Sequence, residues 1–373
     1  MPLRPCVVTV HRCLSCELFK ENCAMRLGLI GLGRVTWQLE ADPLRSKPCT
    51  HLGAWRCLPM VDLVAVCDLD ASRLSEFCNA HPGVRGYSDY RAMLAAERLD
   101  LLSIAAYADT RYEMVLSACT AGVKAIWCEK AMATSRDEAR QIVDAVNAAG
   151  VRFAVSFPRR WCPTYQWVAR GLQNREFGHV ESVNVHFSSN FAHTGTHAFD
   201  VLRMWFGEVQ SVRGWLQGES QWIRDSGYRH GAPLTESSSA ADLGGFALLD
   251  FENGVRATIH AHAKRYLRFE FEILTDECML RIGNAQLEVW HIQDSSCYSG
   301  FRELAPSDPP KLKHVNLFAA VAQNLVNTDP IACSAVDGLN ALAIALAIHE
   351  SHGKDHQAIN PQEVNPALRI LSR

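Results

Sequence analysis

The chain of 373 residues is long enough for two domains that each bury a core of their own. Its formal net charge of -3 and isoelectric point near 6.6 give no reason to expect nucleic acid or an anionic membrane surface as a partner. No apolar run reaches the roughly 20 residues of a membrane helix, and the apolar stretch near the N-terminus is too short for a secretory signal. We expect a soluble protein, and we interpret its 14 scattered cysteines as reduced thiols in the cytoplasm.

Residues 1–24 differ in composition from the rest of the chain. They contain Cys6, Cys13, Cys16, Cys23 and His11, and the Cys13-x-x-Cys16 spacing is compatible with a zinc or iron-sulfur site. No second pair of thiols at ligand spacing follows nearby. We therefore predict an N-terminal extension with little packed structure and no metal.

A glycine-rich turn follows the first predicted strand. The apolar run 27–30 leads directly into Gly31-Leu32-Gly33, where glycine allows a sharp turn and a close approach of a pyrophosphate. The third glycine of G-x-G-x-x-G is replaced by Thr36, so an ordinary tight turn is the alternative. The cofactor contacts predicted for this turn are Gly31, Gly33, Arg34 and Val35.

The second predicted strand ends on an acid. Residues 37–48 are polar and broken by proline, which indicates an insertion, and residues 51–58 are predicted to be helical. Residues 61–67 form a continuous apolar run of the kind found in a buried parallel strand. Asp68 follows, where an adenosine ribose 2'-hydroxyl would be held, and no arginine comes next to accept a 2'-phosphate. The sequence therefore favours NAD over NADP, with a plain strand-end turn residue as the alternative for Asp68.

Strands and helices then alternate up to residue 150. Strands are predicted at 100–106 and 124–128, and helices at 71–80, 87–97, 111–121 and 135–150, the last opened by a capping box at Ser135 and Glu138. Such alternation predicts a doubly wound parallel sheet over residues 25–150. Its ligand crevice lies at the carboxyl ends of the strands, which is where Gly31, Asp68, Ala106, Glu129 and Lys130 all fall.

From residue 151 the pattern changes to that of an α+β domain extending to residue 373. Strands are predicted at 152–157 and 180–187, helices at 161–174, 196–206, 315–326 and 338–350, and a polar loop at 219–239. Residues 255–263 alternate, with Arg256, Thr258, His260 and His262 on one face. We predict a large, mostly antiparallel open sheet. The apolar helix 338–350 is expected to pack inside the structure, back on the first domain.

Two places carry groups suited to proton transfer. Lys130 follows a buried strand at the cofactor edge, where a lysine of lowered pKa can donate to a carbonyl or relay a hydroxyl proton. On helix 196–206, His197, Asp200 and Arg203 recur every three positions, and Asp200 is placed to hold the imidazole of His197 in one tautomer. His193 lies just upstream. The alternatives are a surface lysine and a solvent-facing polar stripe. His260 and His262 have no carboxylate or cysteine with them, so no metal site is predicted there.

Six motifs in order resemble one known family. IGLGR, VAVCDLD, IWCEKAMATS, FPRRWCP, GTHAFDVLRMWFG and DGLNALAIALAIHES resemble successive signatures of the glucose-fructose oxidoreductase, inositol dehydrogenase and MocA-type dehydrogenases, over residues 26–351. The resemblance implies an N-terminal Rossmann domain and a C-terminal open sheet used in forming a homodimer or homotetramer. It also implies hydride exchange between NAD(P) and a carbinol of a sugar, inositol or related polyol.

The resemblance also assigns residues. Lys130 matches the lysine of the E-K-P motif, which contacts nicotinamide and substrate, and His197 matches the histidine of D-x-G-x-H, usually the proton acceptor. Three positions depart from the family pattern: Ala131 replaces proline, His193 replaces the aspartate, and Ala106-Tyr107 with Arg111 replaces a threonine-proline pair and a histidine. Asp200 would then orient His197. The residues expected to contact the cofactor here are Ala106, Tyr107, Arg111, Glu129 and Lys130, and those expected to contact the substrate are Arg160, Trp161, His193 and His197.

Three functions are compatible with these residues. The first is an NAD-dependent dehydrogenase of a sugar or polyol in which Lys130 and His197, supported by Asp200 and His193, handle the hydroxyl proton. The second, suggested by the altered motifs, is a non-catalytic NAD-responsive regulator. The third is an NAD-assisted glycosidase.

Overall fold

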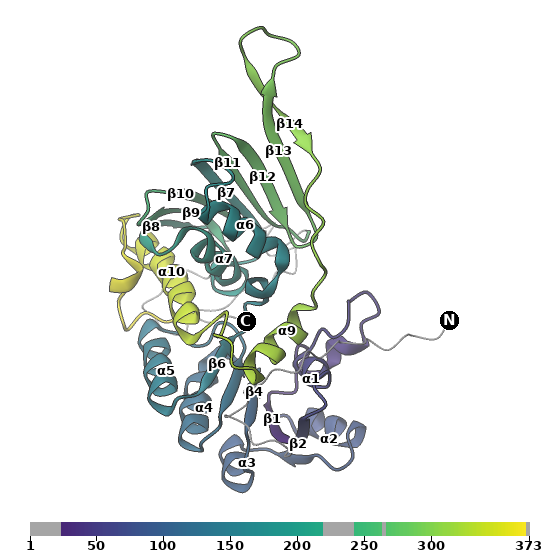
Figure 1. Cartoon of the computed structure of the whole chain (residues 1–373). Coiled ribbons are helices and arrows are strands. Elements are labelled where there is room, and N and C mark those ends of the chain that lie inside the picture. The colour runs from purple at the N-terminus through teal and green to yellow at the C-terminus, as the bar shows by residue number, and fades with distance from the viewer. Residues whose placement is uncertain (1–23, 219–241, 263–265, 371–373) are drawn as a thin grey trace.

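The computed structural model describes residues 24–218, 242–262 and 266–370. They form two β-sheets with their helices, one below the other in Figure 1. The predictions for residues 1–23, including the Cys13-x-x-Cys16 pair, and for the loop at 219–239 fall on residues outside these ranges.

The first sheet has six parallel strands in the order β3-β2-β1-β4-β5-β6. The strands are β1 (Met25–Ile30), β2 (Val61–Cys67), β3 (Arg85–Tyr87), β4 (Leu101–Ile104), β5 (Ala125–Cys128) and β6 (Arg152–Val155). The helices α2 (Ala71–Ala80), α3 (Tyr90–Ala96), α4 (Ala108–Thr120) and α5 (Arg136–Ala149) connect them. The predicted doubly wound sheet is confirmed. Because the strand order reverses between β1 and β4, a crevice opens at their carboxyl ends.

One predicted helix is wrong in part. Residues 87–97 were expected to be helical, but Tyr87 ends β3, and α3 begins at Tyr90. The carboxylate of Asp89 caps this helix by accepting the N–H of Arg91. A strand of three residues is too short to show a periodic pattern in the sequence.

The segment after Gly33 is looped out, as the predicted insertion requires. Residues 34–37 form turns, η1 (Gln38–Ala41) follows, and α1 (His51–Trp55) begins only after Pro48. The N–H groups of His51 and Leu52 donate to the carbonyls of Val35 and Thr36 at 3.1 and 3.0 Å, so the two ends of the loop meet. The helix that covers this part of the sheet therefore starts from His51, whose side chain is buried.

The second sheet has eight strands in the order β14-β13-β12-β11-β7-β10-β9-β8. Its strands are β7 (Val180–Ser188), β8 (Val209–Leu216), β9 (Gly245–Phe251), β10 (Arg256–His262), β11 (Phe269–Thr275), β12 (Cys278–Gly283), β13 (Leu287–Asp294) and β14 (Arg302–Ser307). Only the pair of β7 and β10 is parallel among these strands, so the prediction of a mostly antiparallel sheet is confirmed. The hairpin of β13 and β14 extends away from the rest of the sheet (Figure 1).

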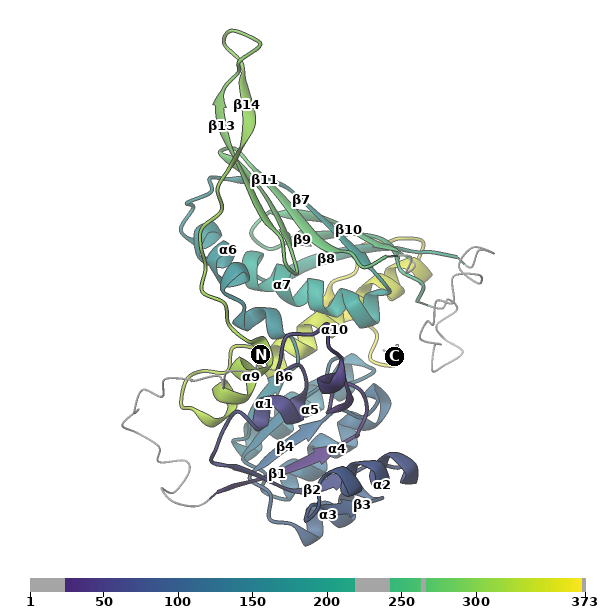
Figure 2. The ribbon, with the colours of Figure 1, turned by 90° about the vertical axis from the view of Figure 1, so that its right-hand side faces the viewer.

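Helices cover one face of this sheet (Figure 2). They are α6 (Pro163–Gln173), α7 (Thr196–Phe206) and α10 (Ala335–Gly353), with the short η2 (Pro158–Trp161), η3 (Phe191–Gly195) and η4 (Pro361–Glu363). Helix α10 contacts β8 and α7 on one side and α5 of the first sheet on the other, and α9 (Leu317–Val326) contacts α1 and β5. The apolar C-terminal helix thus packs against both parts of the protein, which places α7 near the edge of the first sheet.

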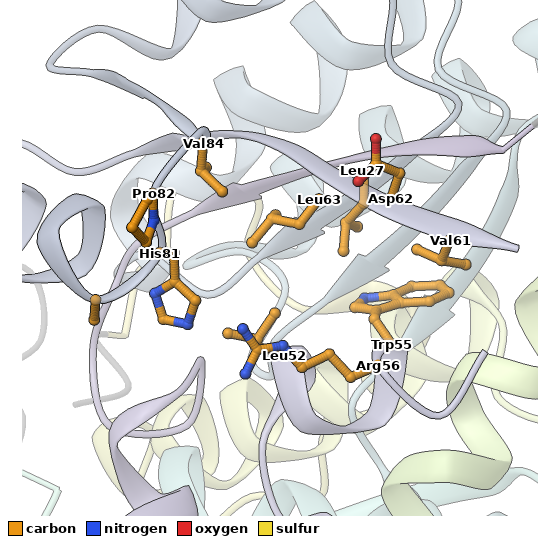
Figure 3. A pocket seen from close by; sticks show the side chains of 11 residues that line it. Leu27, Leu52, Trp55, Arg56, Val61, Asp62, Leu63, His81, Pro82 and Val84 are labelled. Atoms are coloured by element: carbon orange, nitrogen blue, oxygen red, sulfur yellow. The ribbon is translucent and has the colours of Figure 1, made fainter. Parts of the chain in front are cut away.

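Within the described ranges, no helix is long and apolar enough to cross a membrane. A hollow of about 430 Å³ lies beside α1, near the starts of β1 and β2 (Figure 3). Leu27, Leu52, Trp55 and Leu63 form its apolar part, and Arg56 and His81 lie at its border. Because a doubly wound sheet binds its ligand at the carboxyl ends of the strands, this hollow is not the expected cofactor crevice.

Candidate active site

Lys130 lies two residues after the end of β5 and contacts the second part of the protein. Its side chain is buried, and Nζ lies 3.0 Å from Nδ1 of His193 and donates to the carbonyl of the same residue at 3.2 Å. The peptide bond to Ala131 is cis. Burial lowers the pKa of the Lys130 ammonium to about 8; Arg111 and Arg159 act in the same direction, and Glu129 opposes them. A lysine with this pKa can exchange a proton near neutral pH.

Glu129 is fixed by the helix that follows the insertion. Its Oε1 lies 3.1 Å from Nε2 of His51, and the His51 ring stacks on Trp127 with ring centroids 3.9 Å apart. Burial opposes ionisation of Glu129, but His51, Ser156 and Arg111 together lower its pKa to about 2. Lys130 therefore has an ionised carboxylate as its sequence neighbour. His51 was not predicted as a site residue, because only folding brings it to β5.

Arg111 connects the loops after β4 and β5. Its Nε donates to the carbonyl of Ala106 at 2.9 Å, and its Nη1 donates to the carbonyl of Ala131. It is buried in the first turns of α4, whereas Tyr107, the N-cap of this helix, is 64% exposed. Arg111 therefore holds together the two loops that flank the crevice.

His197 lies on the first turn of α7 and faces the end of β6. Its ring packs edge-to-face on Phe157, with centroids 5.3 Å apart, and its buried Nδ1 has no hydrogen-bond partner among the described residues. Burial lowers the pKa of the imidazole well below its ordinary value, and Lys130, Arg159 and His193 lower it further. The imidazole is therefore neutral at neutral pH, as a proton acceptor must be.

The expectation that Asp200 orients His197 is wrong in this structure. Both oxygens of Asp200 accept from Nε of Arg160, at 3.0 and 3.1 Å, and no hydrogen bond joins Asp200 to His197. Arg160 also pairs with Asp337 of α10 at 2.9 Å. Helical spacing put Asp200 and His197 one turn apart, but the carboxylate turns towards a guanidinium because a buried charge needs a partner.

Arg160 and Trp161, the two other predicted substrate residues, also bind side chains of the protein itself. Arg160 is held by Asp200 and Asp337, and the indole N–H of Trp161 donates to Asn324 at 3.3 Å. Their neighbour Arg159 was not singled out in the sequence, although it belongs to the same motif. Its guanidinium lies over the ring of Phe269, 3.8 Å from the centroid, and its charge acts on both Lys130 and His197.

The glycine-rich turn has the shape that a dinucleotide needs. Gly31 has φ of +85°, and a Cβ there would lie 2.7 Å from the backbone nitrogen of Ala106, so only glycine fits. A Cβ on Gly33 would meet nothing within 4 Å, which leaves its open side free for a ligand. Of the two other predicted contacts in the turn, Arg34 is exposed and Val35 is half-buried.

Asp68 stabilises this turn from the end of β2. Its Oδ2 accepts the N–H of Leu32 at 2.7 Å, its Oδ1 accepts the N–H of Asp70 at 2.8 Å, and Oδ1 lies 3.3 Å from Arg73. The acid is thus at the place where a ribose hydroxyl is bound in this kind of fold. NAD, when bound along this edge, would lie against Gly31, Gly33 and Asp68 and supply a hydride acceptor beside Lys130.

His260 and His262 lie on the sheet face away from α6 and α7, where they meet His186 of β7. The His186 and His260 rings stack with centroids 4.6 Å apart. Within the described ranges, no group of three or more His, Cys, Asp or Glu residues is arranged to hold a metal.

The fold and this edge define an NAD-binding oxidoreductase architecture, and comparison with known proteins identifies the family. Residues 25–157 match the model described as "Oxidoreductase family, NAD-binding Rossmann fold", and residues 189–281 match "GFO/IDH/MocA C-terminal domain". The chain belongs to this family, which confirms the family predicted from the sequence motifs and the NAD cofactor.

Individual relatives are similar over part of their length. The chain is 36% identical over 176 residues to a D-apiose dehydrogenase of Paraburkholderia graminis, covering 43% of the chain and 47% of that protein. It is 32% identical over 157 residues to an inositol 2-dehydrogenase of Acidothermus cellulolyticus, covering 42% of each. The matched region thus spans about half the length of these relatives.

A solved structure shows the same fold over almost the whole chain. It is the WlbA dehydrogenase from Bordetella pertussis in complex with NADH and UDP-GlcNAcA, with a TM-score of 0.67 and 22% identity, covering 90% of this chain and 98% of that one. At this identity the likeness concerns the fold alone.

Proposed function

We propose that the protein is an NAD-dependent dehydrogenase that oxidises a CH–OH group of a sugar, inositol or related polyol. The observation that carries the proposal is the meeting of Lys130 with His193, at 3.0 Å, on the cofactor edge of the first sheet. The names of the relatives, D-apiose dehydrogenase and inositol 2-dehydrogenase, support the substrate class.

In this reaction the substrate carbon gives a hydride to bound NAD, and its hydroxyl proton passes to the protein. Lys130 and His197 are the proposed acceptors, because burial favours the neutral form of both. His193 positions the Lys130 amine through its ring and its carbonyl. The cofactor side of the site would consist of Gly31, Gly33, Arg34, Val35, Asp68, Ala106, Tyr107, Arg111 and Glu129.

The experiment is a screen of sugars, inositols and sugar acids for NADH production, with NADP in parallel. Lys130→Ala and His197→Ala should bind NAD but lose about 10²- to 10⁴-fold in turnover. Lys354→Ala, at the exposed C-cap of α10, and His291→Ala, at an exposed position on β13, serve as matched controls and should keep full activity. Full turnover in both site variants would contradict the proposal.

A non-catalytic NAD-responsive regulator is the second candidate. The observation in its favour is that Nζ of Lys130 already has two partners on His193. NAD binding without NADH production from any compound of the screen would support it.

We also propose that the protein acts in the cytoplasm as a homodimer or homotetramer. The many cysteines support a reducing compartment, and the helix-free face of the second sheet supports association (Figure 2). Light scattering of the purified chain tests the assembly, and a monomer at all concentrations would contradict it.

A further inference from the structure

Basic side chains gather at the proposed substrate side of the site. We call Lys130, Arg159, His193 and His197 the basic cluster. Lys130 contacts His193, the ring of Phe157 packs on His197, and Arg159 follows Phe157 by two residues on η2. Arg159 and Lys130 both act electrostatically on His197, so the four groups share one region.

The nearby carboxylates are used elsewhere. Glu129 is bound by His51 and Ser156, Asp200 by Arg160, and Asp242 by backbone N–H groups with His349 beside it. No ion pair joins Arg159 to a carboxylate anywhere in the described ranges, and its buried Nε has no hydrogen-bond partner there. A guanidinium is charged at any physiological pH. Within the described ranges, the positive charge of Arg159 is therefore not paired with a carboxylate.

The cofactor does not account for Arg159. The groups expected to face its pyrophosphate are the turn at Gly31 and the residues after β4, all on the first sheet. Arg159 instead belongs to the second part of the protein, where it lies on Phe269 of β11 and its Nη2 donates to Asn284, directly after β12, at 2.6 Å. It is therefore on the substrate side of the cluster.

We propose that the substrate is an anionic polyol, such as a sugar acid, and that Arg159 binds its negatively charged group while Lys130 and His197 face the hydroxyl that is oxidised. This inference rests on the proposed function, since it specifies the substrate of the same site. A carboxylate or a phosphate ester offers the oxygen acceptors that a guanidinium binds in pairs. Either group would also balance the charge of Arg159, which no carboxylate in the described part of the chain pairs with.

The first test is binding, which does not require turnover. The full chain with NADH is titrated by calorimetry with matched pairs, D-gluconate against sorbitol, D-galactonate against galactitol and D-mannonate against mannitol, and with sorbitol 6-phosphate to separate the two kinds of anion. We expect at least one acid or phosphate to bind about 10- to 100-fold tighter than its neutral partner. The preference should shrink as salt is added.

Variants of Arg159 then locate the effect. Arg159→Gln should remove the preference for the anion without changing the dissociation constant of NADH, and Arg159→Lys should keep part of it because the charge remains. In turnover, Arg159→Gln should raise KM for the anionic substrate and leave kcat nearly unchanged at pH values well above the Lys130 pKa, where the amine is neutral in both proteins. Arg256→Gln, at an exposed position on β10, is the matched control and should change nothing.

The outcomes separate this inference from the function on which it rests. If neutral polyols are oxidised as efficiently as the acids, and Arg159→Gln changes KM equally for both, the inference is overturned. The proposed dehydrogenase function is then still supported. If an anion binds through Arg159 but no compound reduces NAD, the anion site is supported and the dehydrogenase is not. If no anion binds more tightly than its neutral partner, the inference is overturned.

Discussion

The imidazole of His51 lies 3.1 Å from the carboxylate of Glu129, and both side chains are buried. His51 is the first residue of α1, whereas Glu129 follows β5 at the crevice. The segment that returns from the insertion thus supports the residue next to Lys130. A hydrogen bond to a buried ionised group contributes more than one between neutral groups, and its loss leaves the carboxylate poorly solvated.

His51→Phe should therefore lower the free energy of unfolding by about 1–3 kcal/mol, measured by urea unfolding. His51→Gln keeps a donor and should recover part of this. Since the Glu129 pKa is about 2 in the fold, below its ordinary 4.5, the pair stabilises the protein above pH 4.5, and this contribution falls as the pH drops towards 2. In His51→Phe the pKa of Glu129 in the fold is depressed less, so the loss on acidification should be smaller and should be complete at a higher pH. Equal stability of both variants and the wild type at pH 7 would show that Glu129 does not depend on His51.

A second buried carboxylate shapes the segment that carries His193. Asp242 accepts the N–H groups of Phe191 and Ala192 at 3.1 and 2.8 Å, and Nε2 of His349 lies 3.4 Å from it. Burial opposes ionisation of Asp242, but His349 and these N–H groups lower its pKa. Asp242 is thus a positioning residue. It fixes the start of η3, and His193, the partner of Lys130, lies two residues further on.

Asp242→Asn offers one acceptor oxygen instead of two and should displace His193. Because a displacement of about 1 Å can cost up to 10²-fold in rate, we expect kcat to fall by about 10-fold or more, with the dissociation constant of NADH unchanged. Steady-state kinetics and NADH titration measure the two effects. Asp250→Asn, on β9 and paired with Arg256, is the control and should retain kcat. A loss of NADH binding that matches the loss of kcat would argue for general destabilisation instead.

The cofactor preference can be tested at the end of β2. Arg73 lies 3.3 Å from Asp68, a pairing that the sequence did not reveal because five positions and the start of α2 separate the two residues. Asp68→Ser removes the acid expected to bind the ribose and frees Arg73 for a 2'-phosphate. We expect the NADP-to-NAD ratio of kcat/KM to rise about 10-fold or more. In Asp68→Ser with Arg73→Gln the rise should disappear, and a rise of the same size in the double variant would exclude Arg73.

Most of the fold could be predicted because its signals are local. The apolar run at 61–67, the N-caps and the change from helix-strand alternation to period-two strands are properties of neighbouring residues. The candidate site could be predicted only where a strand end, a helical stripe or a family motif indicated it, as for Lys130, His193 and His197. The roles of His51, Arg159 and Asp242 depend on contacts over long sequence separations, such as the 78 positions between His51 and Glu129. The sequence alone also does not distinguish Arg159 from Arg160, which are adjacent in one motif. The structure distinguishes them, because Arg160 forms an ion pair with Asp200.

The pH dependence of turnover tests the proposed role of Lys130. Burial lowers its pKa to about 8, so the amine is mainly protonated below pH 8 and mainly neutral above it. A base that takes the hydroxyl proton must be neutral, and an acid that returns it must be protonated. Oxidation should therefore speed up as the pH rises through about 8, and the reverse reduction should slow down over the same range. Arg159→Gln removes a positive charge that lowers this pKa, so both profiles should shift to higher pH. The scan should cover about pH 6 to 10. Flat profiles over this range would assign the proton to another group.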